Sequence, residues 1–198
     1  MKKKQLVLAS ANRHKAEELR RIFEGYEVLT LEDVGFSEEI EENGETFEEN
    51  ALIKARAVHR ATGRTVIADD SGVCVAALGG APGVHSARYA GVHGDDGANN
   101  AKLLRELRDV PEEKRGAVFV SAAAVVFADG SEGVKRGEVE GVITFEERGN
   151  GGFGYDPLFL CRESGKRYAE MSMEEKNVIS HRRRAFEELR PVIEEYFR

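Results

Sequence analysis

The sequence predicts an α/β fold with a mixed β-sheet flanked by helices. In the first part of the chain, short apolar runs alternate with segments whose apolar residues recur at helical spacing, which is typical of strand–helix units. Later, two long extended runs are separated by Asp129-Gly130, the strongest hairpin turn in the sequence. Because the hairpin adds antiparallel strands to the strand–helix units, we expect a mixed sheet.

Length and composition favour one well-cored globular domain. The chain has 198 residues, of which 41% are hydrophobic and 33% are charged. The formal charge of −7 argues against polymeric nucleic acid as a partner but is compatible with a small anion held by a few local cations. Cys74 and Cys161 are far apart and predict free thiols in a reducing compartment. We find no signal peptide and no apolar run of membrane-spanning length, and therefore expect no membrane partner and a cytoplasmic protein.

The first strand and helix frame a candidate phosphate site. Residues 5–9 are typical of a buried strand, and residues 12–24 have helical apolar spacing. Between them, Ser10, Asn12 and Lys15 add donors to the free amides and positive dipole end of a helix start. The segment lacks the Walker pattern. The alternative, in which Asn12 only caps the helix and Lys15 points to water, is somewhat favoured by these residues alone.

A second strand is expected over residues 26–31, followed by an acidic connection over residues 38–45. Most of these acids must be solvated, but one of them could be a metal ligand, since like charges near one site require a cation. Thr46-x-x-Glu49 is a capping box that begins a helix. Asn50 and Lys54 lie on a face next to its apolar stripe. From this spacing alone, Lys54 is as readily an exposed lysine as a ligand.

The stretch Asp69-Asp70-Ser71-Gly72 follows a strand that opens at Thr65. The β-branched pair Val66-Ile67 favours a strand, and Asp-Asp-Ser-Gly is turn chemistry, so we expect both carboxylates where a sheet edge meets solvent. Paired oxygen ligands suit Mg²⁺ that carries a phosphate ester. The alternative, that the two acids merely form the turn, has about equal weight on local grounds.

The remaining elements follow in order. We expect a strand at residues 73–75, a glycine-rich loop at 78–83, a helix at 99–107, strands at 116–128, 134–145 and 158–161, a helix after the Ser172-x-x-Glu175 capping box, and a terminal helix after residue 180. The sequence contains no zinc-ligand spacing and no serine-hydrolase motif.

A glycine-rich segment with two aromatic residues spans residues 148–157. Its glycines allow the backbone to approach a ligand closely, Phe153 and Tyr155 offer rings on which a base could stack, and Asp156 offers a hydrogen-bonding group. This combination predicts a nucleobase site. A flexible turn whose aromatic residues cover the core ranks second.

Six motifs follow one another between about residue 6 and residue 196. They are Ser10-x-Asn12-x-x-Lys15, Glu42-x-Gly44-x-Thr46-Phe47-x-x-Asn50-Ala51-x-x-Lys54-Ala55, Ala68-Asp69-Asp70-Ser71-Gly72, Gly79-Gly80-x-Pro82-Gly83, Gly151-Gly152-Phe153-Gly154-Tyr155-Asp156-Pro157 and Ser180-His181-Arg182. Together they closely resemble the inosine/xanthosine triphosphate pyrophosphatase family, the house-cleaning enzymes that hydrolyse deaminated purine nucleoside triphosphates.

The resemblance implies an elongated mixed sheet flanked by helices, with two lobes and a central cleft in a single nucleotide pyrophosphatase domain over residues 1–198, and a homodimer. It also implies hydrolysis of ITP, dITP and XTP between the α and β phosphates to the nucleoside monophosphate and pyrophosphate. Magnesium (Mg²⁺) is the implied cofactor. The sequence departs from the family only in minor ways, such as Ser10 where many members have Thr.

Site residues are implied position by position. Glu42 and Asp70 are the implied metal ligands, and Asp70 is also the implied catalytic proton acceptor. From the sequence we do not separate the roles of Asp69 and Asp70, and Arg88 is a weaker transfer. The implied substrate-binding residues are Ser10, Asn12, Lys15, Lys54, Ser71, Phe153, Gly154, Tyr155, Asp156, Lys176, His181 and Arg182.

Two other functions stay open. One is a related-fold pyrophosphatase that prefers pyrimidine or modified nucleotides, against which the purine-stacking loop argues. The other is a nucleotide-sensing module without chemistry, against which the presence of both Glu42 and Asp70 argues. Hypoxanthine and xanthine carry a 6-oxo group and N1–H, so a buried donor such as Arg182 would be left unpaired on ATP. Guanine shares the 6-oxo group, and its rejection does not follow from the sequence.

Overall fold

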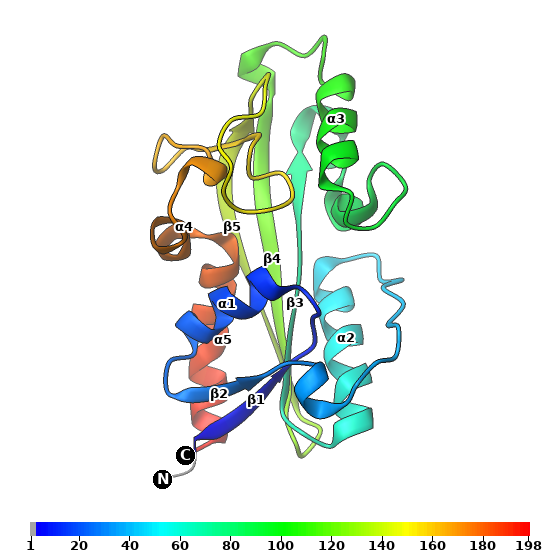
Figure 1. Cartoon of the computed structure of the whole chain (residues 1–198), viewed down its shortest axis with the longest axis vertical. Helices are drawn as coiled ribbons and strands as arrows, with labels where there is room; N and C mark the ends of the chain where they lie inside the picture. The colour runs from blue at the N-terminus through cyan, green and yellow to red at the C-terminus, as the bar shows by residue number, and fades with distance from the viewer. Residues whose placement is uncertain (1–2) are drawn as a thin grey trace. The chain divides into compact units, whose positions relative to one another are not determined.

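A computed structural model describes residues 3–198 and contains a six-stranded sheet with helices (Figure 1). The strand order is β2-β1-β3-β4-β5-β6. Strand β1 is parallel to β2 and β3, whereas β5 is antiparallel to β6, so the predicted mixed α/β fold is confirmed. The strands are β1 (Lys4–Leu8), β2 (Tyr26–Leu29), β3 (Val66–Val75), β4 (Gly116–Val126), β5 (Glu132–Ile143) and β6 (Phe159–Cys161). The α-helices are α1 (Arg13–Ile22), α2 (Phe47–Thr62), α3 (Asp96–Glu106), α4 (Met173–Ile179) and α5 (His181–Tyr196), and the 3-10 helices are η1 (Glu32–Val34), η2 (Ala76–Leu78), η3 (Gly83–Arg88), η4 (Glu112–Lys114) and η5 (Tyr168–Glu170).

The chain divides into two compact units. Unit 1 comprises Met1–Asp70, Ser121–Gly137 and Arg182–Arg198, and unit 2 comprises Ser71–Val120 and Glu138–His181. The boundary falls inside three strands, β3, β4 and β5. Asp70 therefore belongs to unit 1, and its neighbour Ser71 belongs to unit 2.

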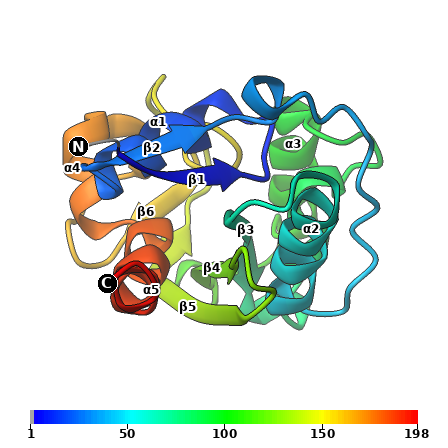
Figure 2. The same ribbon diagram turned by 90° about the horizontal axis from the view of Figure 1, so that it is seen from below.

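Unit 1 has helices on both faces of its strands (Figures 1 and 2). Leu6, Leu8 and Ile67 pack in one buried cluster with apolar residues of α1 and α5. Their strand neighbours Val7 and Val66 pack in a second cluster with residues of α2. This alternation follows from strand geometry, because successive side chains point to opposite faces.

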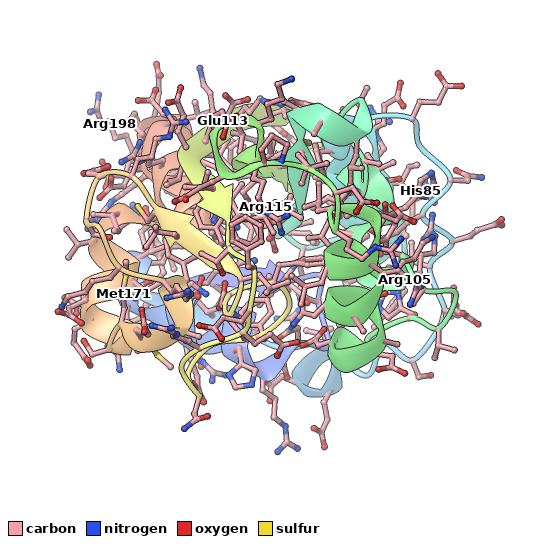
Figure 3. All side chains as sticks on the ribbon, turned by 90° about the horizontal axis from the view of Figure 1, so that it is seen from above. His85, Arg105, Glu113, Arg115, Met171 and Arg198 are labelled. Carbon is pink, nitrogen blue, oxygen red and sulfur yellow. The ribbon has the colours of Figure 1, made fainter. Side chains whose placement is uncertain are left out.

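Unit 2 has a buried apolar cluster, and Arg115 is a buried cation beside it. Residues of β3, α3, β4 and β6 share the cluster, which includes Val73, Leu103, Phe119 and Phe159. The guanidinium of Arg115 is 1% exposed and donates to the carbonyl oxygens of Leu107, Val110, Ile143 and Thr144. Figure 3 shows Arg115 among the interior side chains, next to α3. Arg115 therefore joins the end of α3 to the end of β5.

Local sequence signals located most element ends to within three residues. Asn12 is the N-cap of α1, and its side chain accepts from the His14 and Lys15 amides. Both predicted capping boxes are present, Thr46 with Glu49 at α2 and Ser172 with Glu175 at α4. Helix α3 begins three residues before its predicted start, because Asp95 caps it by accepting from the Ala98 amide. Among residues 3–198, none of the helices has the length and apolarity needed to cross a membrane.

The turn predicted at Asp69-Asp70-Ser71-Gly72 is wrong. These residues continue β3, a ten-residue strand, and both carboxylates are buried rather than at a solvent edge. Turn propensity is a local preference, and here strand pairing and the charged partners described below override it. Within residues 3–198, Cys74 and Cys161 form no disulfide, as predicted.

Candidate active site

The adjacent acids Asp69 and Asp70 point to opposite faces of β3 and have different partners. Asp69 is 1% exposed, and its Oδ2 lies 3.1 Å from Lys15 Nζ and 3.0 Å from Arg182 Nε. Asp70 accepts from Asn50 Nδ2 at 3.1 Å and lies 3.5 Å from Lys54 Nζ. Asp69 thus belongs to the α1 and α5 face, whereas Asp70 belongs to the α2 face, a separation that the sequence did not provide.

On the first face, a buried network joins α1, β3 and α5. Arg182 is 1% exposed and donates through Nη1 to Glu18 Oε2 at 2.5 Å, in addition to its bond with Asp69. Burial alone would lower the pKa of Arg182, but Asp69 and Glu18 raise it above its ordinary value. Burial lowers the pKa of Lys15, and the positive charge of Arg182 lowers it further, although the negative charge of Asp69 opposes both. Two cations and two anions therefore neutralise one another here.

On the second face, Lys54 bridges two carboxylates. Its Nζ lies 2.6 Å from Glu42 Oε2 and 3.5 Å from Asp70 Oδ1. Burial lowers the pKa of Lys54, but Asp70 and Glu42 outweigh it and hold the pKa above its ordinary value. Burial raises the pKa of Asp70, and Glu42 adds to this rise although Lys54 and Lys15 oppose it. With one cation and two anions, this cluster carries a net charge of −1.

The loop that carries Glu42 is held to α2 and β3 by Asn50. The Asn50 side chain accepts from the Gly44 amide at 2.8 Å and donates to Asp70 at 3.1 Å. One side-chain amide therefore holds both the loop that carries Glu42 and the Asp70 carboxylate. A Cβ atom at Gly44 would lie 2.8 Å from Asn50 Oδ1 and 2.8 Å from Glu49 Cβ, closer than side chains normally approach. Position 44 therefore requires glycine because the loop passes directly over the helix start.

The donor set of this second cluster fits a divalent cation. Glu42 and Asp70 supply hard carboxylate oxygens that already share one positive charge, and the cluster has one negative charge in excess. Mg²⁺ typically takes one or two carboxylates and leaves its other positions to water and phosphate. Glu42 and Asp70 are thus the residues of unit 1 that could hold this metal.

The segment from Ser10 to Lys15 has fewer free amides than the sequence suggests. Asn12 Oδ1 accepts from the amides of His14 and Lys15, and Ser10 Oγ accepts from the Asn12 amide. At the helix start, the Lys15 ammonium is therefore more available to an anion than these amides are. Asn12 caps the helix, as in the alternative expected from local sequence, but Lys15 pairs with Asp69 instead of pointing to water as that alternative required.

In unit 2, the glycine-aromatic loop is anchored by hydrogen bonds of three buried side chains, Asp156, Lys176 and Tyr155. Asp156 Oδ2 accepts from the Phe153 amide at 2.9 Å and from Lys176 Nζ at 2.6 Å. Lys176 also lies 4.7 Å from the centroid of the Phe153 ring. Tyr155 is 4% exposed, and its hydroxyl donates to the Ser86 carbonyl at 2.7 Å. Phe153 is the half-buried ring of the pair, so it is the one that can stack on a ligand.

His181 packs in a stack of rings rather than on the surface. Its imidazole lies parallel to Phe119, with 4.6 Å between centroids, and nearly parallel to Tyr168 at 6.1 Å. Ser71 is half-buried at the start of unit 2, and Arg88 ends η3. The predicted site residues fall in both units. Those in unit 1 are Ser10, Asn12, Lys15, Glu42, Lys54, Asp70 and Arg182. Those in unit 2 are Ser71, Phe153, Gly154, Tyr155, Asp156, Lys176 and His181.

Sequence reasoning missed Glu18 and did not anticipate the partners of Asn50. Glu18 is 4% exposed on α1 and shares a buried face with Ile22 one turn later, a position where an acid requires a buried partner. Asn50 was noted for its helix face, but its bonds to Gly44 and Asp70 depend on tertiary contacts.

A separate cavity of about 300 Å³ in unit 2 is lined by Cys74, Gly116, Glu140 and Arg162, among others, and by none of the predicted site residues.

Comparisons with known proteins identify the family. A family model described as the Ham1 family matches residues 6–192. The chain is 53% identical over 195 residues to a dITP/XTP pyrophosphatase of Mycolicibacterium paratuberculosis, which covers 96% of this chain and 95% of that protein. It is 48% identical over 193 residues to a dITP/XTP pyrophosphatase of Bacillus subtilis, with 96% and 98% covered.

Solved structures match over nearly the whole chain. The Ham1 protein of Staphylococcus aureus superposes with a TM-score of 0.87 at 41% identity, covering 98% of this chain and 100% of that one. A HAM1 protein from Coxiella burnetii superposes with a TM-score of 0.86 at 39% identity, covering 97% and 99%. From the matched residues 6–192 and these near full-length identities, we conclude that the chain belongs to the Ham1 family.

Proposed function

We propose that this protein hydrolyses deaminated purine nucleoside triphosphates, namely ITP, dITP and XTP, to the nucleoside monophosphate and pyrophosphate. The observation that supports it best is the convergence of Glu42 and Asp70 on Lys54 Nζ, because residues distant in sequence there combine metal-binding oxygens with a phosphate-binding amine. Its relatives named dITP/XTP pyrophosphatase support the substrate class.

In this proposal, Glu42 and Asp70 hold Mg²⁺. When bound, the metal would act as a Lewis acid on the phosphoryl oxygens. Lys54 and Lys15 would neutralise the negative charge of the triphosphate, since both ammonium groups are held in place by carboxylates. The Ser10 hydroxyl and Ser71 are proposed to contact the same substrate.

Asp70 is also the proposed proton acceptor. Its burial raises its pKa, and a more basic carboxylate takes a proton from the attacking water more readily. Asn50 donates to Asp70 Oδ2 and so fixes the plane of the carboxylate. Asp69 would act differently, because it holds Lys15 and Arg182 in position rather than contacting the reacting atoms.

For the purine, we propose that the Phe153 ring stacks on the base. Lys176 and His181 would contribute to the same subsite, together with the backbone of Gly154, Tyr155 and Asp156. The buried Tyr155 ring supports the loop. Asp156 is bound to Lys176, so its direct role is to shape the loop, in contrast to the base-reading role expected from sequence. We further propose that the two units form one nucleotide pyrophosphatase domain, and that the protein works as a cytoplasmic homodimer.

The test is incubation of the purified protein with Mg²⁺ and ITP, XTP, dITP, ATP, GTP or dUTP, followed by identification of the products. Monophosphate plus pyrophosphate from the three deaminated purine substrates, with little from ATP and GTP, is the expected result. Release of orthophosphate would indicate another phosphatase, preference for dUTP would indicate the pyrimidine-specific class, and tight binding without turnover would indicate a sensor.

A further inference from the structure

We propose that Asp96 and Asn100 of α3 are positioning residues for the purine: they hold the backbone of Gly154 and thereby fix the orientation of the Phe153 ring. This inference rests on the proposed function, because it gives two further residues a part in binding the same substrate. Neither residue belongs to the motifs on which the sequence-based site assignment depends.

The contacts form a two-point clamp on one residue. The Gly154 amide donates to Asp96 Oδ2 at 2.7 Å, and Asn100 Nδ2 donates to the Gly154 carbonyl at 3.1 Å. Asp96 and Asn100 are four residues apart on α3 and therefore lie on the same helix face. Figures 1 and 3 show α3, in green, beside the yellow loop that contains Gly154. One helix face thus holds both polar backbone groups of a single loop residue.

Gly154 is the point where the loop needs this restraint. Its φ is +62°, in the left-handed region, and a glycine has more backbone freedom than any other residue. Its neighbours are anchored elsewhere: the Phe153 amide donates to Asp156, and the Tyr155 hydroxyl donates to the Ser86 carbonyl. Without the clamp, the remaining freedom of the loop would be concentrated next to Phe153, and the ring would sample more orientations.

The identity of residue 100 points to this bond rather than to packing. Asn100 is 3% exposed, and within residues 3–198 its Oδ1 atom has no hydrogen-bond partner. An unpaired buried acceptor disfavours folding, so a residue present only to fill space would be better apolar. The amide of Asn100 is therefore explained by the donor that it supplies to Gly154.

The test measures kcat and KM for ITP in four variants. Asn100→Leu removes the donor at similar size, and Asp96→Leu removes the acceptor at a half-buried position where folding is less sensitive. For each we expect KM to rise about tenfold, the factor that corresponds to one hydrogen bond, with kcat within about twofold of the unaltered protein. Asp96→Asn keeps an oxygen that can accept from Gly154, and should restore KM to within about threefold.

Asn99→Leu is the matched control. Asn99 is 2% exposed on the same helix, but its side chain bonds the Ala90 amide and the Ala87 carbonyl instead of Gly154. We expect this variant to lower the thermal midpoint as Asn100→Leu does, while KM for ITP stays unchanged. An equal rise of KM in both variants, or a loss of kcat at constant KM, would overturn the proposal.

A second measurement needs no substrate. The sequence has no Trp, so a Phe153→Trp variant carries a single fluorophore at the position in question. Adding Asn100→Leu or Asp96→Leu should lower the fluorescence anisotropy of this tryptophan, and adding Asn99→Leu should not. If the protein failed to hydrolyse ITP, the proposed function would be wrong, whereas unchanged anisotropy would reject the clamp itself.

Discussion

Exchanging Asp70 for Asn separates the chemistry of the second cluster from its structure. Asp70→Asn keeps the size of the side chain and changes the charge of the Glu42, Lys54 and Asp70 cluster from −1 to zero. The new amide oxygen can still accept from Asn50, and Lys54 keeps Glu42 at 2.6 Å. We therefore expect the free energy of unfolding to change by only about 1 kcal/mol.

The effect on turnover should be far larger. The variant loses one of two carboxylate ligands and the proposed proton acceptor, so we expect kcat for ITP to fall by about 1,000-fold, which corresponds to about 4 kcal/mol in the barrier. The assay is pyrophosphate release at saturating Mg²⁺, with thermal unfolding of the same sample as the test of folding. A folded Asp70→Asn protein that retains a tenth of the activity would refute the assignment.

The neighbouring residue supplies the control. Asp69→Asn takes away the carboxylate that lies 3.1 Å from Lys15 and one of the two that contact Arg182. Breaking a buried charge network of this kind typically lowers the free energy of unfolding by about 3–5 kcal/mol. We expect Asp69→Asn to be clearly destabilised and Asp70→Asn not, and equal destabilisation by the two changes would contradict the separation of their roles.

Three further predictions concern pH, stability and the base loop. Because burial lowers the pKa of Lys15 below its ordinary 10.5, KM for ITP should begin to rise at a lower pH than that at which an ordinary lysine deprotonates. Lys15→Arg stays charged and should remove this alkaline rise from a profile of KM against pH. A rise that persists in Lys15→Arg would reject the role. Arg115→Met removes a buried donor from four carbonyl groups and should lower the free energy of unfolding in urea by about 3–5 kcal/mol. A loss under about 1 kcal/mol would be the contrary result. Gly152→Ala would put a Cβ atom 2.0 Å from Asp156 Oδ2 at a φ of +73° and should raise KM for ITP by at least about tenfold. Gly165→Ala, at a φ of +67° in open space, is its control and should leave KM unchanged.

Much of the architecture could be predicted because it depends on short-range physics. The strands and helices follow from apolar periodicity, and their ends follow from caps such as Asn12, Thr46 and Ser172, whose side chains bond amides within three residues. The same local logic failed at Asp69 and Asp70, where turn propensity is overridden by membership of a long strand.

Apolar periodicity and capping motifs were sufficient to predict the mixed α/β fold and the capped helices, and the sequence motifs supplied candidate residues for binding a metal, a triphosphate and a base, which stay predictions. Their partners follow from the packing of distant elements: Asp69 pairs with Lys15 and Arg182, and Asp70 contacts Asn50 and Lys54. The physical reason is sequence distance. The Arg182–Asp69 bond joins residues 113 positions apart, and no local preference encodes such a pair. It forms because strand geometry turns adjacent side chains to opposite faces, and because a buried charge must find its partner on the element that covers that face.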